Sequence, residues 1–78
     1  MKVAIVEAGE SREEIIKRDL DGVEPTVTIT VAGAAESGRS SIAGIMRNSI
    51  RKNLIDTGRF TKPGAILIEI ITTTPAAA

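Results

Sequence analysis

The 78-residue sequence contains no cysteine, histidine, tryptophan or tyrosine, and its one aromatic residue is Phe60. Without cysteine the chain can form neither a disulfide nor a thiolate metal site. Without histidine it lacks the commonest metal ligand and the side chain that titrates most readily near neutral pH. Catalytic triads that need histidine or cysteine are excluded as well. We therefore expect no metal, no cofactor and no catalytic residues, and we favour a protein that is not an enzyme.

Long apolar segments are also missing. No apolar run approaches the roughly 18 residues that a membrane-spanning helix needs. The N-terminal stretch MKVAIVEAGES becomes acidic at Glu7 and Glu10, which is untypical of a signal peptide. We therefore expect a cytoplasmic protein without membrane contact, of a kind that a virus could also encode.

The composition that remains is typical of a small globular domain, with 42% apolar and 26% charged residues. A chain of this length buries only about 60–65% of the surface that it exposes when unfolded. Domains this small usually depend on disulfides, metals or oligomerisation, and the composition disfavours the first two. We therefore predict one domain over residues 1–78, with a frayed tail at 75–78, that forms a homo-oligomer or binds a partner protein.

The net charge of zero hides an uneven distribution along the chain. Residues 1–37 contain four basic and eight acidic residues, for a net charge of −4. Residues 38–78 contain six basic and two acidic residues, for a net charge of +4. Such a separation favours charge-guided contact, either with a polyanion or head-to-tail between copies of the chain.

The periodicity of apolar residues predicts three strands and two helices. In the segment 26–31, Val27, Ile29 and Val31 share one face and threonines share the other. A parallel strand covered by helices on both faces would be continuously apolar, so we expect helices on one face of the sheet only. The last strand is apolar on both faces for much of its length, which predicts that it is central or covered by another copy. The predicted elements are strands at 2–7, 26–33 and 65–74, and helices at 12–20 and 40–56.

These elements predict an α/β or α+β fold with the order β-α-β-α-β. A three-stranded sheet would form one layer, and both helices on one of its faces would form the other. Both connections are long enough for helical crossovers, so a parallel or mixed sheet is allowed. A capping box at Ser11 and Glu14 predicts the start of the first helix. The second helix is predicted to bury residues spaced by four, namely Ile42, Met46, Ile50 and Leu54.

One stretch, from Gly33 to Ser40, has the spacing of the phosphate-binding loop G-x-x-x-x-G-K-[ST], with Arg39 in the place of the lysine. A predicted strand precedes it and a predicted helix follows, so loop amides and the helix N-terminus could surround a phosphate. The resemblance covers eight residues only, and arginine offers a planar fork where that motif uses a point charge. A flexible connection of small residues, with Ser40 or Ser41 capping the helix, is the simpler interpretation.

Basic residues on the second helix form another candidate site. Arg47 and Arg51 are four residues apart, so they share one helix face that could rest on phosphates. The lack of tyrosine and tryptophan and a pI of about 6.2 argue against a nucleic-acid module. A solvated helix face, or one paired with the acidic half of a neighbouring copy, is the simpler interpretation. The candidate anion-binding residues are Gly33, Gly38, Arg39, Ser40, Ser41, Arg47 and Arg51.

The sequence thus favours a small non-enzymatic module that works as an oligomer or as a structural accessory to a partner protein. The alternative is an anion-binding module that holds a nucleotide or a nucleic-acid backbone through the loop 33–41 and the basic second helix. An enzyme subunit is a third interpretation, supported only by the phosphate-like loop.

Overall fold

The computed structural model describes residues 2–59 and 64–73 and confirms the α/β class and the predicted order of elements. The tail expected at 75–78 lies outside the described residues. A short π-helix, η1, directly continues the second helix. The elements are β1 (Lys2–Val6), α1 (Arg12–Asp19), β2 (Val27–Gly33), α2 (Arg39–Ile50), η1 (Arg51–Ile55) and β3 (Ala65–Thr72).

β3 is the central strand of a three-stranded sheet with the order β1-β3-β2. Both neighbours are parallel to β3, and Ile68 lies opposite Ile5 on one side and opposite Ile29 on the other. The side chains of β3 are buried from Ala65 through Ile68. The prediction that the last strand is central is confirmed, because a strand covered on both faces keeps consecutive apolar side chains out of water.

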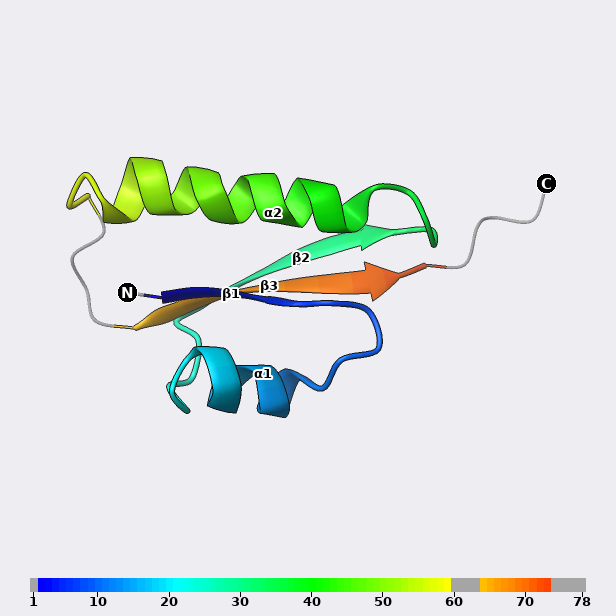
Figure 1. Ribbon diagram of the computed structural model, residues 1–78, viewed down its shortest axis with the longest axis horizontal. Coiled ribbons are helices and arrows are strands. Elements are labelled where there is room, and N and C mark those ends of the chain that lie inside the picture. Colours follow the sequence, from blue (N-terminus) through cyan, green and yellow to red (C-terminus); the bar gives the residue numbers. More distant parts are fainter. Residues whose placement is uncertain (1, 60–63, 74–78) are drawn as a thin grey trace.

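The two helices lie on opposite faces of this sheet (Figure 1), so the predicted two-layer arrangement is wrong. α1 packs Ile15 and Leu20 into a cluster with Leu67 on one face. α2 packs Ala43 into a cluster with Ile68 on the other face. Because consecutive residues of a strand point to opposite faces, Leu67 and Ile68 anchor separate clusters, and the domain has three layers.

The order of the strands explains why the helices are separated. The connection from β1 to β2 passes β3 in one direction, and the connection from β2 to β3 returns in the other. Crossovers between parallel strands have the same, right-handed sense in about 98% of cases. Two crossovers of the same hand that run in opposite directions must place their helices on opposite faces of the sheet.

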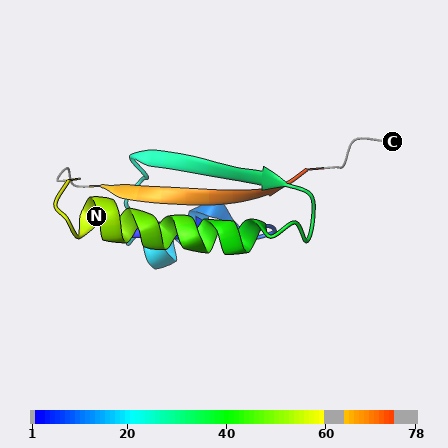
Figure 2. The ribbon, with the colours of Figure 1, turned by 90° about the horizontal axis from the view of Figure 1, so that it is seen from above.

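The alternating pattern of β2 has a different cause from the one expected. Thr28 and Thr30 are exposed although α1 lies on their side of the sheet, because α1 packs mainly over β1. On the other face Ile29 and Val31 are only partly buried against α2, and Val27 is exposed. Figure 2 shows β2 at the side of the sheet, beyond the line of α2. The alternation therefore marks an edge strand and not a sheet with one bare face.

The buried side of α2 is centred on Ala43. The prediction that Ile42 lies on the buried side is wrong. Ala43 is fully buried, whereas Ile42 is 50% exposed and Ile45 is 66% exposed. The small side chain of Ala43 allows the helix to approach the sheet closely, with these two isoleucines turned outward. Met46 and Ile50 are partly buried against the sheet, in agreement with the prediction.

Replacing Leu67 or Ile68 by alanine tests the three-layer arrangement. Each side chain is completely buried, Leu67 on the α1 face and Ile68 on the α2 face. We expect each substitution to lower the free energy of unfolding by about 2–5 kcal/mol in denaturant titration, because each leaves a cavity. Ile71→Ala, at a position 45% exposed on the same strand, is the control and should change it by about 0.5 kcal/mol. A decrease in unfolding free energy for Leu67→Ala as small as that of the control would contradict the packing of α1 on this face of the sheet.

Candidate functional site

The loop 34–38, which joins β2 to α2, borders a small cavity at the start of α2. Glu36 and Gly38 have left-handed backbone conformations, with φ angles of 60° and 84°. Residues 36–41 line the cavity, whose volume is about 240 Å³. Gly38 is the N-cap of α2 and provides no side-chain hydrogen bond, so the predicted capping by Ser40 or Ser41 is not observed. The carboxylate of Glu36 also places negative charge in the loop that the sequence offers as an alternative anion-binding site.

Arg39 contacts the end of β3. Its Nη1 donates a hydrogen bond of 2.6 Å to Oγ1 of Thr72. A Cβ atom at Gly33 would lie 3.2 Å from Cγ of Arg39 and 2.8 Å from Oγ of Ser37. A side chain at Gly33 would therefore push Arg39 or Ser37 aside. The spacing of Gly33 and Arg39 that resembles a phosphate-binding loop thus has a packing explanation in this chain.

Ser40, Arg47 and Arg51 face a larger hollow, which we call the β1 groove. It has a volume of about 690 Å³ and runs along the outer edge of β1. The structure thus groups three of the predicted site residues here, while Gly33, Gly38, Arg39 and Ser41 lie around the loop. The groove is lined by β1 residues from Lys2 to Ile5, by Glu7 and Glu10, by Arg18 and Asp19 of α1, and by Ser40, Gly44, Arg47 and Arg51.

Two features of the α2 wall of the β1 groove were not found by sequence reasoning. Gly44 lies inside a helix, where glycine costs roughly 0.5–1 kcal/mol relative to alanine, and a Cβ atom there would meet nothing within 4 Å. Nε of Arg47 is buried and has no hydrogen-bond partner among the described residues. The glycine inside the predicted second helix was the one sign in the sequence of a space beside that helix. The sequence could not show that β1 borders this space, because β1 is far from Gly44 along the chain.

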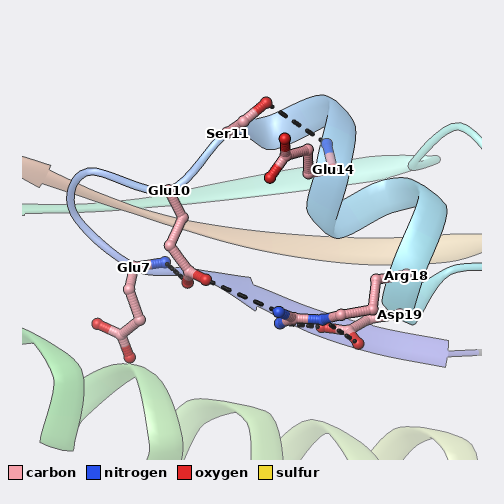
Figure 3. A network of polar contacts seen from close by, with 6 residues as sticks. All are labelled: Glu7, Glu10, Ser11, Glu14, Arg18 and Asp19. Carbon is pink, nitrogen blue, oxygen red and sulfur yellow. Dashed lines mark hydrogen bonds and ion pairs between the residues drawn. The ribbon is translucent and has the colours of Figure 1, made fainter.

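Polar contacts link the connection between β1 and α1 to the end of α1 (Figure 3), and four of these residues line the β1 groove opposite α2. The backbone N–H of Glu7 donates to Oε1 of Glu10 at 3.0 Å, and Glu10 also lies 4.0 Å from Arg18. Arg18 donates two hydrogen bonds of 3.0 Å to Asp19. These two bonds lower the pKa of Asp19 and raise the pKa of Arg18.

One half of the capping box predicted at the start of α1 is confirmed, whereas the return bond from the Ser11 N–H to the Glu14 carboxylate is not observed among the described residues. Oγ of Ser11 accepts a hydrogen bond of 3.5 Å from the backbone N–H of Glu14 (Figure 3). The same hydroxyl donates to Oε2 of Glu13 at 3.2 Å. Hydrogen bonds from its own backbone and from Ser11 lower the pKa of Glu13. Local hydrogen bonds therefore account for the position of the Glu13 carboxylate.

An apolar surface lies beside the other edge of the sheet, and we call it the β2 surface. It consists of Val27, Ile29 and Val31 of β2 with Ile42 and Ile45 of α2. Val27 is 39% exposed, and the two residues of α2 are more exposed still. Ile42 is about half a turn away from the side of α2 that lines the β1 groove, so it lies on the flank toward β2. The sequence analysis missed this surface because it placed Ile42 in the core.

Comparison of the chain with models of known protein families, with curated proteins and with solved structures finds no match. Within residues 2–59 and 64–73, no helix combines the length and the apolar character that crossing a membrane requires. The same residues contain no group of three or more acidic side chains placed to hold a metal ion. Function must therefore be argued from the loop cavity and from the two edges of the sheet.

The hydrogen bonds between Arg18 and Asp19 predict a dependence of stability on pH. Because folding lowers the pKa of Asp19, its contribution is complete above the unfolded pKa of about 3.9 and is lost as the pH falls through the lower folded value. We expect Asp19→Asn to flatten the fall in unfolding free energy between about pH 4 and pH 2, measured by denaturant titration. Asp56→Asn, which removes an exposed carboxylate after η1, is the matched control. If unfolding free energy changes with pH equally in both variants, the dependence does not come from Asp19.

Proposed function

We propose that this chain is a non-enzymatic interaction module that works as an oligomer, or as an accessory to a partner protein, through its β2 surface. One observation carries the proposal: β2 is a seven-residue edge strand with no buried residue. An edge strand presents a row of backbone N–H and C=O groups that can pair with a strand of another chain.

The sequence of β2 offers no protection against such pairing. Natural edge strands are usually protected by charged side chains, by proline, by bulges or by short length. β2 has the sequence VTITVAG, which contains neither a charged residue nor a proline. An edge of this kind is stable against unwanted association when a specific partner occupies it.

The apolar residues of α2 extend the same surface. Ile42 and Ile45 lie three residues apart, so their side chains are neighbours on the helix. Removing such side chains from water contributes roughly 1.5–3 kcal/mol each. For a domain this small, that contribution is a large fraction of the total stability. A second copy supplies a matching surface, since an apolar edge is complementary to another apolar edge.

Anion binding remains a second candidate function. The residues at the start of α2 line a cavity, and the cations of α2 and η1 take part in no ion pair among the described residues. Against it stand the carboxylate of Glu36 beside the cavity and the hydrogen bond of Arg39 to Thr72. The anion would be a phosphate of a nucleotide or of a nucleic-acid backbone.

Replacing Ile42 by lysine tests the interaction module. We expect the unmodified chain to have a solution mass of at least two chains of 8.2 kDa and a melting temperature that rises with protein concentration. Ile42→Lys should lower the mass in light scattering, because it buries a charge in the proposed contact. Val23→Lys makes a matched change at a 47% exposed position in the connection between α1 and β2, and it should leave the mass unchanged. A monomeric mass for the unmodified chain would rule out the oligomer.

Titration with phosphate, ATP and a short DNA duplex tests anion binding. A bound phosphate should shift the amide NMR signals from Gly38 to Ser41. Arg39→Ala should lower the affinity for phosphate and for ATP. The duplex should also need Arg47 and Arg51, because an extended backbone can reach along α2 and a single phosphate cannot. The variant with alanine at both positions should lower the affinity for the duplex but not for phosphate or ATP. The remaining affinity for the duplex should depend less on salt concentration. No shift with any of the three at moderate salt would exclude anion binding.

A further inference from the structure

We propose that the β1 groove binds the β1 edge of a second copy of this chain, in antiparallel orientation about a two-fold axis. Within residues 2–59 and 64–73, β1 pairs with β3 alone, so its outer edge is open to another strand. This contact rests on the proposed role as an interaction module. It uses the edge of the sheet opposite to the β2 surface, so the two contacts can be tested separately.

Charge is divided along the β1 groove. Glu7 and Glu10 lie at the C-terminal end of β1, where Oγ of Ser40 donates a hydrogen bond of 2.7 Å to Glu7. α2 starts at this end and runs antiparallel to the strands (Figure 1). Arg51 lies about 16 Å along the helix from Ser40 at 1.5 Å per residue, which matches the length of β1 from Lys2 to Glu7 at about 3.3 Å per residue. Glu7 and Glu10 therefore lie toward one end of the groove, and Arg47 of α2 and Arg51 of η1 lie toward the other, where Asp19 of α1 also lines it.

The two ends complement each other when a second copy is turned by the two-fold axis. Antiparallel pairing centred on Ala4 sets the acidic end of one groove against the basic end of the other. A two-fold axis perpendicular to the sheet keeps both α2 helices on the same face, and Glu7 points to that face (Figure 3). Glu7 of each copy then faces Arg47 and Arg51 of the other. Parallel pairing of two β1 edges would set like charges together instead.

Among the described residues, no carboxylate forms an ion pair with the arginines of this wall, although Asp19 lines the same groove and the charge of Arg47 acts on it. Every ion pair among the described residues uses Lys2, Arg12 or Arg18 as its cation. Arg47 and Arg51 take part in none, and Nε of Arg47 is buried without a hydrogen-bond partner in the part of the chain that the structure describes. A carboxylate from a second copy would supply the direct ion pair that Arg47 and Arg51 lack among the described residues.

The middle of the groove has room for a neighbouring chain. Ser40 and Gly44 form the nearer part of the α2 wall, and the space around a Cβ atom at Gly44 is empty to 4 Å. In the two-fold pair, α2 of each copy runs past α2 of the other along this wall. The absent side chain lets the two helices approach, which accounts for a glycine inside a helix that would gain stability from alanine.

The test uses the full chain with Ile42→Lys, so that the β2 surface does not contribute. We expect light scattering to give the mass of two chains of 8.2 kDa and hydrogen exchange to show concentration-dependent protection of β1 amides. Adding Arg51→Glu should weaken the dimer about tenfold, because like charges then meet at both ends of the contact. Adding Glu7→Lys to that variant should restore the dimer, because opposite charges face each other again between copies.

Filling the groove is an independent test in the same Ile42→Lys chain. Gly44→Leu should give a monomer whose melting temperature at low concentration is not lower than that of its parent, because nothing inside the chain opposes the new side chain. Gly44→Ala is the matched control for helix propensity, and it should raise the melting temperature while reducing dimerisation less. A dimer that tolerates leucine, or a charge exchange that fails to restore it, would overturn the β1 contact.

The mass of the unmodified chain separates this contact from the proposed function. If the unmodified chain is an oligomer and the Ile42→Lys chain is monomeric at millimolar concentration, the β1 contact is wrong and the β2 surface stands. If the Ile42→Lys chain is a dimer that responds to Arg51→Glu and Glu7→Lys as expected, the β1 contact stands. If both chains are monomeric, the β1 contact and the oligomer fail together.

Discussion

The burial of both faces of β3 is the constraint on which the rest of this structure depends. Leu67 and Ile68 are neighbours in sequence and are both fully removed from water. Side chains of adjacent strand residues point to opposite faces, so each face needs its own cover. The described residues form two α-helices, so one lies on each face, and the outer strands become the two open edges. The layers and both candidate surfaces therefore follow from placing this one strand at the centre.

What the sequence could predict was set by local chemistry. Ser11 caps α1 because its hydroxyl reaches the amide of Glu14 within one turn, and that contact needs no information about the fold. The central position of β3 followed from its apolar character on both faces. The layering did not follow, because it depends on which strands are neighbours. The alternation of β2 was taken as a sign of one covered face, whereas it results from a position at the edge.

The candidate site shows the same division between local and distant chemistry. The spacing of Gly33 and Arg39 suggested a phosphate-binding loop, but packing of the arginine side chain against the glycine explains the pair. The β1 groove could not be read from spacing, because Ser40 and Glu7 meet across 33 residues of sequence. The uneven distribution of charge was visible in the sequence. Only the fold shows that the acidic and basic residues lie at opposite ends of one groove.

The two edges of the sheet differ in chemistry, and this difference limits how copies can associate. The β1 edge carries opposite charges at its ends, whereas the β2 edge carries none and lies beside exposed isoleucines. Joining a β1 edge to a β2 edge would bury charges against apolar side chains, which is costly. In the proposed contacts each edge therefore pairs with a copy of itself, and each such contact would be two-fold. A chain that used only one contact would close as a dimer, whereas use of both would extend the sheet from copy to copy in an open array.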